Sequence, residues 1–133
     1  MDQIEQLGQA LALIFSKLYA LNGQGKVPEA IEMTNQSLKR EIDLNIEELT
    51  SIPTELFVGI LRMKQKCNHT NLEHIGDILV LIADNLVGNE TGKAQGLNLY
   101  AKSLKIYNYL NDSDLTYSIE RQSKIERIKY LLE

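Results

Sequence analysis

Apolar residues return every three or four positions along almost the whole chain, and this spacing constrains the fold more than any other feature. The first stretch shows it most clearly, at Ile4, Leu7, Leu11, Ile14, Phe15, Leu18 and Leu21. Such steps place side chains on one face of an α-helix, whereas a half-buried strand requires strict alternation. No segment combines sustained alternation with β-branched residues between turns, so we predict an all-α protein without a sheet.

Capping and turn residues divide this pattern into six or seven helices. The run Asn22-Gly23-Gln24-Gly25 ends the first helix, because glycine accepts the left-handed conformation that closes helices. Asn45 with Glu48, and Thr70 with Glu73, each have the spacing of a capping box at a helix start. The last helix is expected to carry Leu115, Ile119, Ile125, Ile128 and Leu132.

Length and charge exclude several classes of protein. A chain of 133 residues suits one domain, 1–133, that buries a core without disulfides or metals. The net charge of -4 argues against nucleic acid as a partner, because phosphate binding needs a concentrated positive field. A single cysteine, Cys67, allows no intramolecular disulfide, which suits the reducing cytoplasm. The apolar runs are too short or too polar to span a bilayer, so we predict a cytoplasmic protein without a membrane partner.

Two segments offset by 66 residues, from Ser37 to Ser103, share a pattern of small and apolar side chains. The small residues Ala30 and Gly96 align, and Leu38 aligns with Leu104. The offset is about twice the 34-residue tetratricopeptide period. Small side chains at these positions suit the second helix of a hairpin, where the first helix crosses closely.

These residues resemble tetratricopeptide-like helical-hairpin repeat proteins. The resemblance covers residues 2–43 and 71–110, while the middle, 44–69, departs from the pattern. The layout is similar to an uncharacterised bacterial family, which implies no activity. It implies stacked antiparallel helical hairpins with an irregular middle and a C-terminal capping helix; an irregular helical bundle is the alternative. We expect the core to include Leu11, Phe15, Leu18, Ile31, Leu38, Ile78, Ile82, Leu104 and Ile128.

Polar residues between positions 69 and 84 are the strongest candidates for chemistry. His69, Glu73, His74 and Asp77 are of metal-ligating types but lack the spacing of a three- or four-ligand site, and acidic residues also favour a first helical turn. Glu73, Asp77 and Asp84 share one helical face, which we interpret first as a solvated surface. We therefore predict no catalytic, cofactor-binding or metal-binding residue.

Aromatic and basic residues concentrate in the last third of the chain. Tyr100 and Tyr107 share a helical face, and we interpret them as core residues with hydrogen-bonded hydroxyls. Cys67 lies beside Lys66 and near His69, but this is insufficient to predict a nucleophile. The cations of the last helix are interpreted as the solvated face of a capping helix: Arg121, Lys124, Arg127 and Lys129.

The sequence favours a non-enzymatic protein-interaction or adaptor module, because helical repeats present extended surfaces more often than catalytic clefts. A peptide or protein segment, a basic one among the candidates, would dock on the concave face, which the repeat register assigns to Lys17, Asp77, Val80, Asp84 and Val87. Homo-oligomerisation is a further hypothesis. The alternative is a small-molecule or metal-binding sensor or enzyme with a pocket near His74, Asp77 and Asp84.

Overall fold

The computed structural model describes residues 2–114 and 117–133, and the protein is all-helical there. Within these ranges the elements are α1 (Gln3–Gly23), α2 (Val27–Ile42), α3 (Ile46–Ser51), the 3-10 turn η1 (Thr54–Leu56), α4 (Phe57–Arg62), α5 (His69–Leu86), α6 (Lys93–Ser113) and α7 (Ile119–Leu132). No strand occurs in the described ranges, which confirms the predicted all-α class. No helix in them is long and apolar enough to cross a membrane. Leu115, expected in the last helix, lies outside the described residues.

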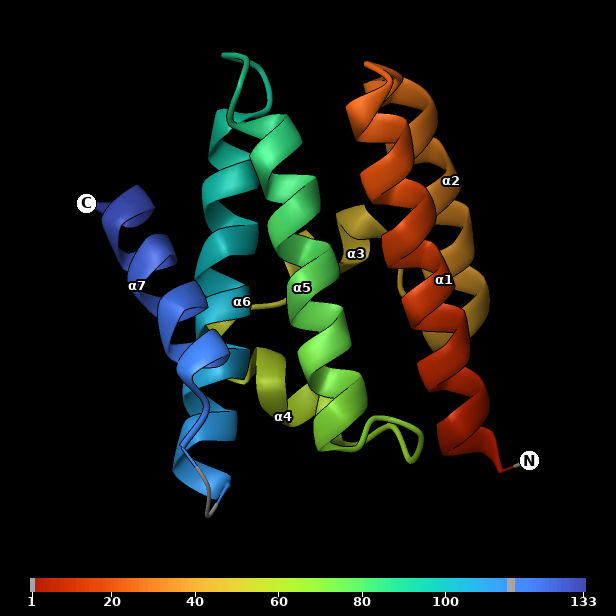
Figure 1. Cartoon of the computed structure of the whole chain (residues 1–133), viewed down its shortest axis with the longest axis vertical. Helices are drawn as coiled ribbons and strands as arrows, with labels where there is room; N and C mark the ends of the chain where they lie inside the picture. Colours follow the sequence, from red (N-terminus) through yellow and green to blue (C-terminus); the bar gives the residue numbers. More distant parts are fainter. Residues whose placement is uncertain (1, 115–116) are drawn as a thin grey trace.

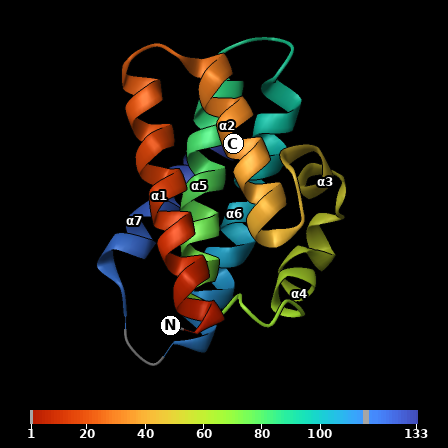
Figure 2. The same cartoon turned by 90° about the vertical axis from the view of Figure 1, so that its right-hand side faces the viewer.

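The long helices stand side by side, with α5 between α1 and α6 (Figure 1). α1 and α2 form one antiparallel pair, and α5 and α6 form the other, which has the most extensive helix contact. The first helices of the two pairs, α1 and α5, pack against each other. α7 packs on α6, while α3, η1 and α4 contact a different side of α6 (Figure 2).

Small residues let α5 and α6 approach closely. A Cβ atom at Gly76 would lie 3.0 Å from Cε1 of Tyr107, and one at Gly96 would lie 2.6 Å from Cγ1 of Val87. The Ser103 hydroxyl donates to the Gly76 carbonyl over 3.0 Å. The small side chains noted at Gly96 and Ser103 in the sequence therefore mark the helix crossing inside this pair.

The core runs through both helix pairs and contains most of the residues predicted for it. Six of the nine are buried: Leu11, Leu18, Leu38, Ile78, Ile82 and Ile128. The other three are partly buried and pack against that core: Phe15, Ile31 and Leu104. Phe15 is held at the edge because it faces an open cavity described below.

The irregular middle of the chain is held by a cap and a buried lysine. The predicted capping box at Asn45 and Glu48 is present, with N–H···O distances of 2.8 and 3.0 Å. At the other end of α3, Lys102 donates to the Thr50 carbonyl over 2.8 Å and to Asn98 Oδ1 over 2.7 Å. Lys102 is fully buried, and its ammonium group complements the negative end of the α3 dipole. Burial lowers the pKa of Lys102.

The start of α5 corrects one prediction. The N-cap residue is Asn68 and not Thr70, because the Asn68 side chain accepts from the Asn71 N–H at 3.0 Å and the helix already begins at His69. The buried Asn71 amide adds bonds to the carbonyls of Ile4 and Lys66, at 3.0 and 2.7 Å. Glu73 is therefore not part of a cap, and its carboxylate is available to another helix.

Candidate functional site

A hydrogen-bonded link around Asp77 joins three helices. Asp77 Oδ1, on α5, accepts from the Tyr107 hydroxyl of α6 over 2.5 Å and lies 2.9 Å from Lys124 Nζ of α7. The Lys124 ammonium also lies 5.4 Å from the centre of the Tyr107 ring. Burial, followed by the Asp77 charge, raises the pKa of Tyr107, so its hydroxyl stays protonated and acts as a donor. This arrangement confirms the interpretation of Tyr107 as a core residue with a bonded hydroxyl.

The same arrangement repeats two helical turns later around Asp84. Asp84 Oδ1 accepts from the Tyr100 hydroxyl and from Arg127, whose Nη2 is 2.8 Å away. Burial and then the hydrogen bond to Asp84 raise the pKa of Tyr100. Each link thus joins a tyrosine of α6, an aspartate of α5 and a cation of α7. Because the tyrosines and the aspartates are each seven residues apart on antiparallel helices, the two links stack along one face.

A third contact fixes the first turn of α7. Arg121 Nη2 lies 2.7 Å from Glu73 Oε1, and Arg121 Nη1 lies 3.0 Å from Asp114 Oδ2. Lys124 Nζ reaches the other Glu73 oxygen at 3.2 Å. Burial raises the pKa of Glu73, but the hydrogen bond from Arg121 and the charge of Lys124 outweigh it, so the pKa of Glu73 is lowered. The Arg121 side chain is only 9% exposed, so this contact is the most shielded of the α5–α7 ion pairs.

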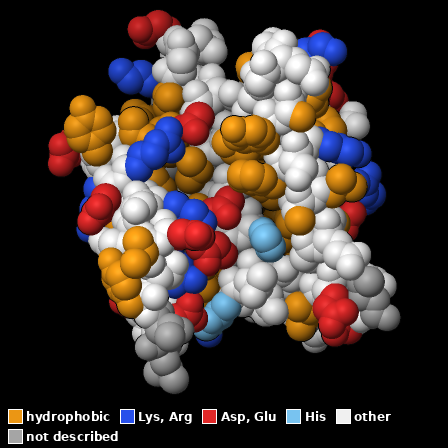
Figure 3. Space-filling view, in the orientation of Figure 1, with side chains coloured by type: hydrophobic (Ala, Val, Ile, Leu, Met, Phe, Trp, Pro, Cys, Tyr) orange, Lys and Arg blue, Asp and Glu red, His pale blue; other side chains and the backbone are white. Residues whose placement is uncertain are grey.

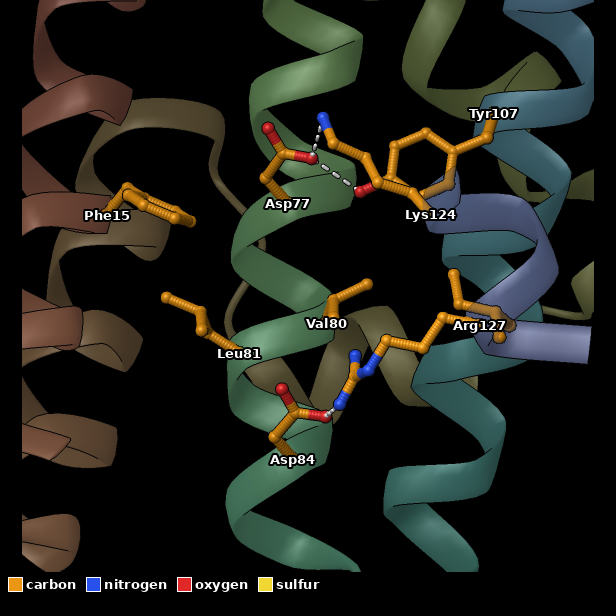
Figure 4. A pocket seen from close by; sticks show the side chains of 9 residues that line it. Phe15, Asp77, Val80, Leu81, Asp84, Tyr107, Lys124 and Arg127 are labelled. Atoms are coloured by element: carbon orange, nitrogen blue, oxygen red, sulfur yellow. Dashed lines mark hydrogen bonds and ion pairs between the residues drawn. The ribbon is translucent and has the colours of Figure 1, made fainter. Parts of the chain in front are cut away.

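An open cavity of about 250 Å³ lies beside the two links, where α7 diverges from α5 (Figure 4). Figure 3 shows the same face, where apolar side chains lie in the hollowed middle beside charges of both signs. The apolar part of the lining combines residues of α1, α5 and α7: Phe15, Val80, Leu81 and Ile128. The polar part is supplied by the two links, through Asp77, Tyr107, Lys124, Asp84 and Arg127.

Each aspartate uses one oxygen and leaves the other toward the cavity. Within the described residues, the hydrogen bonds to Asp77 and Asp84 and their closest ion-pair contacts all go to Oδ1. Figure 4 shows both of these oxygens on the side of Phe15, away from Lys124 and Arg127. A group that enters the cavity from α1 therefore meets carboxylate oxygens and an apolar floor before it meets the cations of α7.

Only part of the predicted binding surface lies at this cavity. Asp77, Val80 and Asp84 line it together. Lys17 instead lines a shallow groove between α1 and α2, because it lies two positions after Phe15 on the helix and therefore points to a different face. Val87 packs toward Gly96 of α6. The structure does not bring Lys17 and Val87 to the cavity.

The other candidate residues identified in the sequence do not line this cavity. His74 is half-buried and does not line the cavity. His69 Nδ1 lies 3.0 Å from Asp114 Oδ1, and His69 Nε2 lies 3.4 Å from the Tyr109 hydroxyl. Cys67 is buried, and burial raises the pKa of its thiol, which disfavours the reactive thiolate. Among the described residues, no group of three or more His, Cys, Asp or Glu could hold a metal ion.

The interpretation of the basic last helix as a solvated face holds for the exposed Arg127 and Lys129 but was wrong for Arg121, which is buried. The acidic face of α5 is half-buried and ion-paired, and is not simply solvated. Arg121, Lys124 and Arg127 all reach carboxylates of α5. The spacing of Arg121, Lys124 and Arg127 in the sequence was the one feature that could have indicated this pairing. Cations three residues apart on one helix can follow an acidic stripe on another, but choosing which helix carries the partners requires the tertiary arrangement.

Comparisons of the chain with protein-family models, with curated proteins and with solved structures found no match.

Proposed function

We propose that this protein is a non-enzymatic interaction module that binds a cationic, partly apolar segment of another protein at the cavity between α1, α5 and α7. The observation that carries the proposal is the pair of aspartate oxygens turned toward an open apolar cavity. The oxygens would accept the partner's cation, and the apolar floor of Val80 and Leu81 would take its apolar side chain. Affinity would come mainly from apolar burial, while the carboxylates would set specificity.

We also propose that the two helix pairs are stacked in the tetratricopeptide manner. The adjacency of α1 and α5, the first helices of both pairs, supports this arrangement. In such a stack the first helices line the concave face. Phe15 of α1 and Val80 of α5 both line the cavity, which fits that assignment.

The volume of the cavity favours a side chain over a free metabolite. A cavity of about 150 Å³ already accommodates benzene, so about 250 Å³ holds one or two large apolar side chains. Pockets for small molecules are more often about 300–1,000 Å³ and more enclosed. A small-molecule sensor using Asp77 and Asp84 is the alternative function, favoured only by the presence of polar and apolar groups in one cavity.

Photo-crosslinking followed by a binding measurement tests the proposal. A photoreactive amino acid in place of Leu81 should give a protein adduct in the native cells, whereas one at the exposed Ser51 of α3 should not. The adduct is identified by mass spectrometry, and the purified partner is titrated against two variants. Val80→Arg should weaken binding at least tenfold, while Val58→Arg, a matched change at a half-buried valine of α4, should not.

Two results would overturn the proposal. One is the absence of a protein adduct at Leu81. The other is normal partner binding by a Val80→Arg variant whose helical circular dichroism is unchanged. A low-molecular-weight compound that stays bound during native mass spectrometry, and is lost in Val80→Arg, would support the sensor instead.

A further inference from the structure

We infer that the partner's docking element is an amphipathic helix with two cationic side chains about two turns apart and an aliphatic or aromatic anchor between them. This inference rests on the proposed function and specifies its partner. Four observations support it: the spacing of the aspartates, the position of the apolar floor, the direction of the free oxygens, and the ion pairs by which cations of α7 already reach α5.

The two aspartates set the spacing of the cations. Asp77 and Asp84 are seven residues apart on α5, which is about 10 Å along the helix axis. Two side chains seven residues apart on a partner helix have the same separation and the same facing. One cation can therefore reach each Oδ2 atom while the helix lies along α5.

The apolar floor sets the position of the anchor. Val80 and Leu81 lie between the two aspartates in the sequence and line the cavity between them (Figure 4). On the α1 side, the ring of Phe15 stacks on Tyr19 with centroids 6.4 Å apart, and Tyr19 is 66% exposed. This aromatic wall extends the apolar surface beyond the cavity, which suits a helix with more than one apolar residue on its docking face.

The chain's own α7 packs on α6, and its cations reach across to the acidic residues of α5. These cations are Arg121, Lys124 and Arg127, and the buried Ile125 and Ile128 lie on α7 among them. α7 thus has the cation–aliphatic pattern inferred for the partner. It covers the edge of the acidic stripe next to α6 and leaves the edge next to α1 open.

The direction of the free oxygens decides the charge of the partner. Lys124 and Arg127 neutralise the two aspartates in total charge, so net charge alone would not favour a cation. However, their ammonium and guanidinium groups contact Oδ1 from the α7 side, while Oδ2 faces α1. A partner that enters between α1 and α7 meets the oxygens first, and Coulomb attraction falls with distance, so a cation is favoured over an anion.

A small set of stapled helical peptides tests the inference directly. Each dye-labelled peptide has about 16 residues, two lysines seven apart and a leucine, phenylalanine or methionine between them. One matched control replaces both lysines by glutamate, and another moves the lysines to different faces by placing them five apart. Binding is followed by fluorescence anisotropy at about 50 and 300 mM salt.

The protein variants isolate the free oxygens from the internal links. In Asp77→Asn with Asp84→Asn, the amide oxygen can still accept from the tyrosine and the α7 cation, but the charge is lost. This double variant should bind the lysine peptides at least tenfold more weakly. Glu47→Gln with Glu55→Gln, exposed acids of α3 and η1, is the matched control and should not change binding.

The outcomes separate this inference from the proposed function. The inference is supported if at least one lysine-pair peptide binds the unmodified protein. That binding must be absent for both control peptides and strongly weakened for the double variant. The inference is overturned if no lysine-pair peptide binds, if the glutamate peptide binds as well, or if binding survives the double variant. Should a crosslinked partner at Leu81 dock through an acidic or extended segment, or be a second copy of this chain, the inference fails while the cavity remains a binding site.

Discussion

The two sides of α5 are bound to the rest of the protein in different ways. On the α6 side, Gly76 and Ser103 allow backbone contact, and the fully buried ring of Tyr107 packs over Gly76. On the α7 side, three cations reach carboxylates whose side chains are about a quarter to a third exposed. Apolar burial depends little on salt, whereas partly exposed ion pairs weaken with salt and with acid.

This difference indicates which part of the protein sets stability and which part can be adjusted. The α5–α6 pair should contribute most of the free energy of unfolding. The docking of α7 should respond to solution conditions without loss of the helix pairs.

Removal of a buried ring should destabilise the whole protein. Tyr107→Ala deletes a large side chain that is 1% exposed, so the free energy of unfolding should fall by about 3–5 kcal/mol. Urea denaturation followed by circular dichroism measures this loss, most of which should persist at high salt. A loss below 1 kcal/mol, or one that vanishes at high salt, would contradict the assignment of stability to the α5–α6 pair.

Arg121→Ala should release α7 while the helix pairs stay folded. The substitution leaves Glu73 without its closest partner in a partly buried position, at a cost of about 1–3 kcal/mol. Amide hydrogen exchange should accelerate in residues 119–132 and stay slow in α5. The division between the two sides is wrong if α5 and α7 lose protection together.

Acid should weaken α7 docking through Glu73. The pKa of Glu73 is lower in the folded state than its ordinary value of 4.5. Its ion pairs therefore stabilise the fold above the ordinary value, and this stabilisation is lost as the pH falls through the lower folded value. Glu73→Gln should flatten the acid limb of a stability-against-pH curve. Asp114, whose pKa is lowered first by its hydrogen bond with His69, should keep part of the slope in that variant.

Arg127→Ala should have the smallest effect. The Arg127 side chain is 51% exposed, and exposed ion pairs contribute about 0.2–1 kcal/mol. The change in the midpoint of urea unfolding should be measurable at low salt and disappear near 1 M salt. An effect as large as that of Arg121→Ala would show that exposure does not distinguish the two contacts.

The sequence was sufficient to predict local features and to predict which residues share a helical face. The periodic apolar residues predicted the helices, the spacing of Asn45 and Glu48 predicted a capping box, and the heptad spacing of Tyr100 and Tyr107 predicted a shared buried face. These features depend on residues a few positions apart. The acidic stripe on α5 was also identified, because Glu73, Asp77 and Asp84 lie on one helical face.

Contacts between distant segments could not be predicted from the sequence. The Arg121–Glu73 pair spans 48 residues and depends on how α7 is oriented where it packs on α6. Lys17 lies away from the cavity for a related reason, since a small rotation of α1 decides which groove a surface residue lines. Asn68 replaced Thr70 as the cap because a neighbouring residue with an equally good capping side chain started the helix earlier.

Chemical modification of the buried Lys102 can measure how often the folded protein opens locally. Lys102 is the one fully buried lysine in the described part of the chain, and its amine is bound to α3 through the Thr50 carbonyl. An amine-specific reagent can modify it only after a local opening, because the side chain is fully buried in the closed state. The rate at which Lys102 is acylated, relative to the exposed lysines, therefore measures how often this corner of the native protein opens.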